Sequence, residues 1–153
     1  MATSHELPYE TCERLLRAGV LGRLVLNRAT GPEIVPVNYT TAGDAILVRT
    51  AVGSLLDKHA DGALLVFEVD HADYDRRHGW SVVARGVGER VRAEDLTDIE
   101  RRAPKPPSWV DRDDEVWIRL DWVTLTGRQV GQGWSPVAEM PVRRAQFSTH
   151  HLE

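Results

Sequence analysis

A helix start and three polar side chains between positions 49 and 58 are spaced as a phosphate site would need them. Arg49 and Thr50 end a run typical of a strand, Gly53 and Ser54 open a short helix, and Lys58 follows one turn later. A helix start offers unpaired N–H groups and a partial positive charge, to which a hydroxyl and a lysine on the same helical face add. An arginine on a partly apolar strand also favours an anionic partner. The pattern predicts a phosphate site or, as the simpler alternative, a solvated helix start with a surface lysine.

Aromatic side chains could cover a planar ligand beside such a site. Tyr39, Trp80 and Trp134 are the candidates, whereas Trp117 and Trp122 lie in the middle of a strand, which favours core or dimer packing. The segment 70–78 is rich in aspartate and histidine but lacks a recognised metal-ligand spacing. We therefore predict a solvated hairpin there and no metal. No residue stands out as a catalytic acid, base or nucleophile.

Short β-branched runs separated by turn residues must position these side chains. They predict strands at 20–27, 33–40, 45–50, 63–70, 80–92 and 115–130, and short helices at 8–19, 53–62 and 93–103. The connections are too short for parallel crossovers, which favours an antiparallel barrel in a single domain, 1–153. Gly86 and Gly88 predict a bend or a close backbone approach. The apolar positions of 115–130 change phase near Trp122, as at a bulge or where both faces are covered.

Composition excludes several classes of protein. The chain has 153 residues with a formal net charge of −4, 42% hydrophobic and 27% charged residues, and one cysteine. A nucleic-acid module would be strongly basic, a membrane helix would need about 18 consecutive apolar residues, and a disulfide scaffold would need more cysteines. No signal peptide is recognisable at residues 1–10. We expect a cytoplasmic protein with no nucleic-acid or membrane partner.

Six segments appear in an order that resembles a known family. They are LLRAGVLGRLVL, IVPVNY, DAILVRTAVGS, LLVFEVD, GWSVVARGVGERV and TLTGRQV, between residues 10 and 130. In this order they resemble the flavin-binding split-barrel family typified by pyridoxamine 5′-phosphate oxidase, in its short bacterial branch. The resemblance implies a mainly β fold, a six-stranded antiparallel split barrel with short flanking helices. It also implies a homodimer with one FMN in each of two clefts at the interface.

The resemblance also assigns cofactor-binding residues by position. It places Val37, Asn38 and Tyr39 near the isoalloxazine and ribityl groups, Arg49 and Thr50 at the flavin or its phosphate, and Ser54 at the phosphate, with Trp80 and Ser81 approaching from a later strand. Leu55 stands where relatives often carry a lysine, so that Lys58 is the nearest basic residue. The C-terminal PVRRAQFSTHH lacks the substrate-phosphate cluster of the oxidase itself. Oxidation of vitamin B6 is therefore not expected.

These features favour an FMN-dependent oxidoreductase that acts on a small molecule, with electrons from a nicotinamide or deazaflavin donor. A deazaflavin cofactor is the alternative to FMN. A non-catalytic binder that stores, carries or senses a flavin, a deazaflavin or haem is a second reading, since the phosphate-site lysine is displaced. A cofactor-free dimeric interaction domain is a third.

Overall fold

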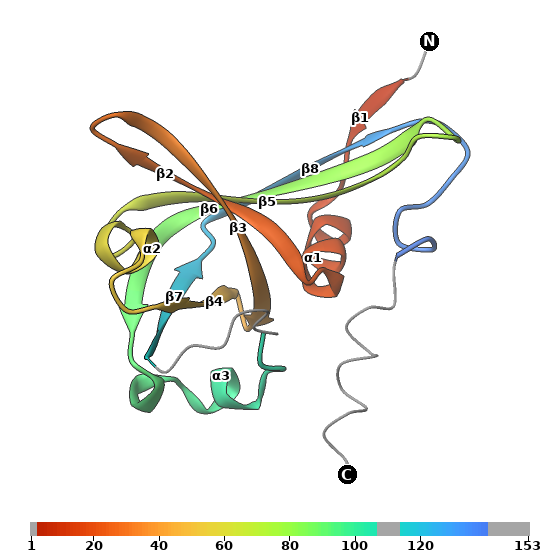
Figure 1. The fold of residues 1–153 in the computed structure, drawn as a ribbon. Helices are drawn as coiled ribbons and strands as arrows, with labels where there is room; N and C mark the ends of the chain where they lie inside the picture. Colours follow the sequence, from red (N-terminus) through yellow and green to blue (C-terminus); the bar gives the residue numbers. More distant parts are fainter. Residues whose placement is uncertain (1–2, 107–113, 141–153) are drawn as a thin grey trace.

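Six strands close into an antiparallel barrel, and two more extend one side of it (Figure 1). The computed structural model describes residues 3–106 and 114–140. The ring runs β6-β5-β2-β3-β4-β7 and closes by pairing β7 with β6, while β8 and then β1 continue the sheet beyond β6. The strands are β1 (Ser4–Glu6), β2 (Leu21–Arg28), β3 (Gly31–Ala42), β4 (Ala45–Ala51), β5 (Leu64–Asp73), β6 (His78–Val91), β7 (Glu115–Asp121) and β8 (Thr124–Val130). The expected six-stranded barrel is thus confirmed, with two additional strands.

The predicted strand 115–130 is two strands that run along successive halves of β6. Leu120 of β7 pairs with Gly88, whereas Thr124 of β8 pairs with Arg85. Between these two pairs, three residues (121–123) therefore oppose two (86–87), which is a one-residue register shift. The phase change seen in the sequence marks this shift.

Glycines let β6 bend between its two sets of partners. A side chain at Gly86 would collide with the carbonyl oxygen of Asp121, and one at Gly88 with that of Ala60. The close backbone approach predicted from these glycines is confirmed. Because of this close approach, β6 pairs with β5 and β8 along its first part and with β7 near its end.

Short helices cap the barrel. α1 (Tyr9–Ala18) buries Cys12, Leu15 and Leu16 in the core, as its apolar side predicted. α2 (Leu55–His59) is shorter than the predicted helix 53–62, and the predicted helix 93–103 is divided into a 3-10 turn (Ala93–Asp95) and α3 (Asp98–Arg102). The segment 71–79, which connects the predicted strands 63–70 and 80–92, is mostly strand, because β5 and β6 extend to a four-residue turn. Within residues 3–106 and 114–140, no helix has the length and apolar character needed to cross a bilayer.

Candidate functional site

Strands β3 and β4 diverge at positions where the family resemblance predicted contacts with a cofactor. Their ladder runs from the Ala42–Ala45 pair to the Tyr39–Val48 pair and stops there, while Asn38 pairs with Leu21 of β2. Asn38 and Arg49 are the first residues beyond the ladder. We call Asn38, Arg49, Thr50 and Ser54 the fork. Asn38 Oδ1 and Arg49 Nε are both buried and have no hydrogen-bond partner.

Arg49 is largely engaged within the chain. Its Nη1 donates to Glu115 at 2.9 Å and its Nη2 to the Pro106 carbonyl at 2.7 Å. The guanidinium also lies over the Trp117 ring, 5.9 Å from the centroid. The sequence predicted a cation available for phosphate, but the structure leaves only Nε without a partner. The competing carboxylate is 66 residues away in the sequence, so local spacing could not reveal it.

The start of α2 is also partly occupied. Ser54 Oγ accepts from the Asp57 N–H at 3.2 Å and lies 2.7 Å from Thr50 Oγ1, so Ser54 caps the helix. Asp57 Oδ2 accepts from the Gly53 N–H at 2.6 Å. One of the helix-start donors expected to meet a phosphate is therefore already bound to a carboxylate. The Ser-x-x-Asp spacing is a capping pattern that could have indicated this.

Asp57, in the first turn of α2, also pairs with an arginine of β6. Asp57 Oδ1 accepts from Arg90 Nε at 2.5 Å. The hydrogen bonds from Arg90 and from the Gly53 N–H lower the pKa of Asp57. Lys58, the basic residue nearest to the fork in the sequence, is exposed in the last turn of α2. The predicted phosphate region thus combines two hydroxyls and an exposed lysine with a nearby carboxylate.

Two predicted residues of β3 have their side chains in the core. Val37 is 8% exposed and Tyr39 is fully buried. The Tyr39 hydroxyl donates to the Leu16 carbonyl at 2.5 Å, and its ring packs edge-on against Phe67. The aromatic cover predicted from Tyr39 is therefore not available on the surface. Strand alternation explains the result, because Val37 and Tyr39 face inward on either side of Asn38.

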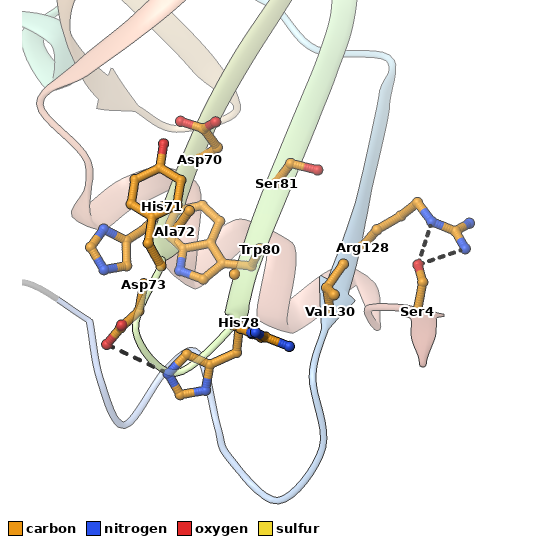
Figure 2. Close-up of a pocket in the computed structure, with 13 residues that line it drawn as sticks. Ser4, Asp70, His71, Ala72, Asp73, His78, Trp80, Ser81, Arg128 and Val130 are labelled. Atoms are coloured by element: carbon orange, nitrogen blue, oxygen red, sulfur yellow. Dashed lines mark hydrogen bonds and ion pairs between the residues drawn. The ribbon is translucent and has the colours of Figure 1, made fainter. Parts of the chain in front are cut away.

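Trp80 and Ser81 line a cavity of about 490 Å³ on the β5–β6 hairpin (Figure 2), which we call the groove. Small residues of neighbouring strands, Ala72, Gly79, Ser81 and Val130, form part of its lining. Polar side chains complete it, including Ser4, Asp70, His71, Asp73, Tyr74, Arg77, His78 and Arg128. Arg128 is held by Ser4, whose Oγ accepts from Nε at 3.1 Å and from Nη2 at 3.0 Å.

Trp80 also lines a second, smaller cavity. This cavity has about 150 Å³ and is bordered by α1, the start of β2 and Met140. Asp70, His71 and Trp80 line both cavities. Trp80 is 6% exposed and belongs to the core cluster. Packing therefore fixes the Trp80 ring, and this residue lines both cavities.

The predicted residues form two groups in one chain. Of those residues, only Trp80 and Ser81 line the groove. Figure 1 shows α2 at one side of the barrel and the tip of the β5–β6 hairpin at the other. The strand registers place Asn38 and Ser81 on the same face of the sheet, with β2 and β5 between them. A ligand that contacts both groups must extend along this face or lie between two subunits.

The acidic and histidine-rich hairpin does not assemble a metal site in the described part of the chain. No group of three histidine, cysteine, aspartate or glutamate side chains there is placed to hold a metal. Asp73 accepts a backbone hydrogen bond from Arg76, which lowers its pKa. The C-terminal segment considered for a substrate-phosphate cluster, 141–151, lies outside the described residues.

Comparison with known proteins gives consistent matches along most of the chain. The family model described as pyridoxamine 5′-phosphate oxidase matches residues 8–129. An uncharacterized protein from Mycobacterium tuberculosis is 30% identical over 130 residues, which cover 82% of this chain and 84% of that protein. The solved FAD binding protein from Mycobacterium smegmatis is 33% identical with a TM-score of 0.72, over 84% of this chain and all (100%) of that chain. An FAD-binding protein from Mesorhizobium loti, 20% identical with a TM-score of 0.67 over 86% of this chain and 100% of that one, shares the fold.

Proposed function

Because the chain belongs to the pyridoxamine 5′-phosphate oxidase family, we propose that it binds a flavin nucleotide between the fork and the groove. One observation carries this proposal. Among the described residues, three buried side-chain polar atoms lack a hydrogen-bond partner: Asn38 Oδ1, Arg49 Nε and His78 Nε2. Two belong to the fork, whereas His78 Nε2 faces the carboxylates of Asp73 and Glu139. Buried polar atoms are normally paired, so the two at the fork support a ligand there.

The donor and acceptor types fit a flavin. An amide oxygen such as Asn38 Oδ1 accepts from a ring N–H, and a guanidinium N–H such as that of Arg49 donates to a carbonyl or phosphate oxygen. The Thr50 and Ser54 hydroxyls and Lys58 would hold the phosphate. The groove, at about 490 Å³, is within the range of small-molecule and cofactor sites, roughly 300–1,000 Å³.

The proposed cofactor is FMN. FMN and FAD share the riboflavin 5′-phosphate unit that the fork and the groove would contact. The relative from Mycobacterium smegmatis that is 33% identical is an FAD binding protein, which supports a flavin but leaves the choice of nucleotide to experiment. A deazaflavin nucleotide has a similar outline and is the alternative.

We further propose a homodimer that covers the outer face of the sheet. Val25 of β2 pairs with Ile34 of β3 on one side and with Val66 of β5 on the other. In the next row, Leu64 pairs with Val87, and these side chains are 64% and 55% exposed. Exposed apolar bands of this kind mark interaction surfaces. Asn38 and Ser81 lie on the same face, so a second copy seated on it would enclose them.

The proposed reaction is an oxidation or reduction of a small molecule, with a nicotinamide or deazaflavin electron donor. A bound flavin supplies the hydride and electron transfer, and the protein supplies binding and orientation. In this chain Trp80 would give a rigid apolar wall, Asn38 would fix the ring orientation, and the fork hydroxyls would anchor the phosphate. No side chain is assigned as a catalytic acid or base.

A non-catalytic binder is the second candidate, and one observation favours it. Arg49 is paired with Glu115, and the Gly53 N–H is bound to Asp57. We therefore expect the fork to bind a phosphate less tightly than the sequence spacing suggested. A weakly anchored cofactor suits a carrier, store or sensor as well as an enzyme.

Binding and turnover measurements separate these candidates. The purified protein is titrated with riboflavin, FMN, FAD and a deazaflavin nucleotide while ligand fluorescence is followed, and with haem while the Soret band is followed. We expect saturable binding of a flavin at micromolar concentration or below. Binding without NADPH oxidation above the free-flavin rate, with and without a nitroaromatic acceptor, would favour the binder. Failure of every flavin and of the deazaflavin to bind would overturn the proposal.

A further inference from the structure

The last described segment, 131–140, which we call the strap, reverses direction after β8, beside the tip of the β5–β6 hairpin (Figure 1). Trp134, Val137 and Met140 are partly buried and pack against the core cluster. Gln129 Nε2 donates to the Trp134 carbonyl at 3.1 Å, and Trp134 Nε1 donates to the Val130 carbonyl at 3.1 Å. The strap is therefore docked by apolar contacts and, at its beginning, by these two hydrogen bonds and two more to Thr3, from the Gly131 N–H at 3.2 Å and from Gln132 Nε2 at 2.7 Å.

The turn that starts the strap requires glycine. Gly131 has a φ of +95°, a conformation that side chains rarely adopt. A Cβ at this position would also lie 2.6 Å from the Cβ of His78. The chain reversal at Gly131 thus brings the strap directly beside His78.

His78 lies where the hairpin and the strap meet. Its ring centroid is 4.1 Å from that of Trp134, and its side chain is 10% exposed. Its Nε2 has no hydrogen-bond partner but lies 3.8 Å from Asp73 Oδ2 and 3.7 Å from Glu139 Oε2 (Figure 2 shows the Asp73 contact). A neutral imidazole therefore leaves a buried nitrogen unsatisfied, whereas a protonated one faces two carboxylates.

The charged groups around His78 come from three segments. Asp73 belongs to the end of β5, Arg76 to the turn and Glu139 to the strap. Arg76 bridges the two carboxylates, with Nε 3.7 Å from Asp73 Oδ2 and Nη1 3.6 Å from Glu139 Oε2. Arg76 is two-thirds exposed, at 66%, so its attraction is screened by solvent more than that of the buried imidazole.

We propose that His78 is a protonation-dependent latch that fastens the strap to the β5–β6 hairpin through Glu139. Histidine changes charge between about pH 5 and pH 8. Protonation adds an ionic attraction to Glu139 across the junction, so the docked strap is favoured as the pH falls. With a neutral imidazole, the strap keeps only its apolar contacts, the hydrogen bonds at its beginning and the exposed Arg76 pair.

The latch affects both cavities. His78 and Asp73 line the groove, and Met140 of the strap lines the smaller cavity next to Trp80. Release of the strap would therefore remove Met140 from the wall of the smaller cavity. It would also remove the contacts of the strap with His78, which lines the groove. The inference concerns the chain itself and does not depend on which ligand binds.

Hydrogen exchange of the strap amides tests the latch. Protection factors, corrected for the intrinsic exchange rate, are measured for peptides from 131–140 at about pH 5.5 and about pH 8, on either side of histidine titration. We expect strap protection to be at least threefold higher at the lower pH in the unmodified protein. In Glu139→Gln this difference should fall below 1.5-fold, because the substitution removes the charge that His78 attracts.

Two variants complete the test. His78→Gln should also abolish the pH difference, but Glu139→Gln is decisive, since residue 139 is 38% exposed at its side chain and its replacement leaves the core intact. Glu33→Gln is the matched control, because Glu33 is similarly exposed and pairs with Arg28 on the β2–β3 hairpin. It should keep the full difference. A strap insensitive to pH in the unmodified protein, or an unchanged pH difference in Glu139→Gln, would overturn the proposal.

Discussion

Asp57 accepts a hydrogen bond from the Gly53 N–H at 2.6 Å, so the start of α2 binds one of its own carboxylates. Arg90 of β6 donates to the same side chain at 2.5 Å. The proposed phosphate region therefore contains a negative charge that the sequence pattern did not reveal, and the charge can be removed without changing the shape of the side chain.

Asp57→Asn should strengthen the binding of FMN. Loss of the carboxylate charge reduces repulsion of the cofactor phosphate, while the uncharged riboflavin is not affected. We expect at least threefold tighter FMN binding and less than a twofold change for riboflavin, measured by fluorescence titration. Asp98→Asn, an exposed position on α3, is the control and should change neither. Equal effects on FMN and riboflavin would show that Asp57 does not act on the phosphate.

Ser54→Ala combined with Lys58→Ala should weaken FMN binding at least tenfold, which is about 1.4 kcal/mol, and leave riboflavin binding nearly unchanged. Both side chains are proposed to act on the phosphate alone. Ser54 also caps α2, so the double variant should lose about 1 kcal/mol of folding stability and must be assayed well below its melting temperature. Lys105→Ala, also at an exposed lysine, is the control. An equal loss for both ligands would contradict a phosphate role.

Leu64→Lys should shift the protein from dimer to monomer. Leu64 is 64% exposed in the apolar band proposed as the subunit interface, and a lysine there would bury an unpaired charge in the dimer. Sedimentation velocity at micromolar concentration measures the change. Ile99→Lys is the matched control, because Ile99 is also 64% exposed but lies on α3. A monomeric unmodified protein, or a dimer that tolerates Leu64→Lys, would exclude this interface.

Stability should fall in acid, partly through Glu100. Arg119 donates to both of its carboxylate oxygens, at 2.5 and 2.7 Å, and these bonds, with those from Thr97, lower the pKa of Glu100. A depressed carboxyl pKa contributes stability above the unfolded value of about 4.3, and this contribution is lost as the pH falls through the lower folded value.

Glu100→Gln tests this linkage. The variant should lose about 2 kcal/mol at neutral pH, because the largely buried Arg119 keeps only the exposed Glu89 as an ionic partner, and its stability should fall less steeply below about pH 4. Urea unfolding at several pH values gives both quantities. Glu33→Gln should retain the slope of the unmodified protein. An unchanged acid slope in Glu100→Gln would contradict the assignment.

Local pattern was sufficient for much of the fold. Alternation and turn residues placed the strands, the phase change near Trp122 marked the register shift between β7 and β8, and Gly86 and Gly88 marked the close approaches within the barrel. Each of these features is determined by residues close together in the chain. For that reason a single sequence was enough to predict them.

The site was harder to predict, because its electrostatics depend on distant partners. Arg49 pairs with Glu115, and Asp57 pairs with Arg90, 33 residues away. The inward direction of Tyr39 could have been read from strand alternation, since Val37 and Tyr39 share a face opposite to that of Asn38. The family resemblance predicts which residues contact the cofactor. The folded structure is needed to show which other residues of the chain bind the same side chains.

The pairing of β1 with β8 has a consequence for how the protein is made. Ser4 pairs with Val130, so during synthesis β1 has no partner strand until β8 has been made. Until then the free edge of β6 is open to other chains in the cell. We expect nascent chains halted before residue 124 to require chaperone protection, and chains that include β8 to need it only briefly.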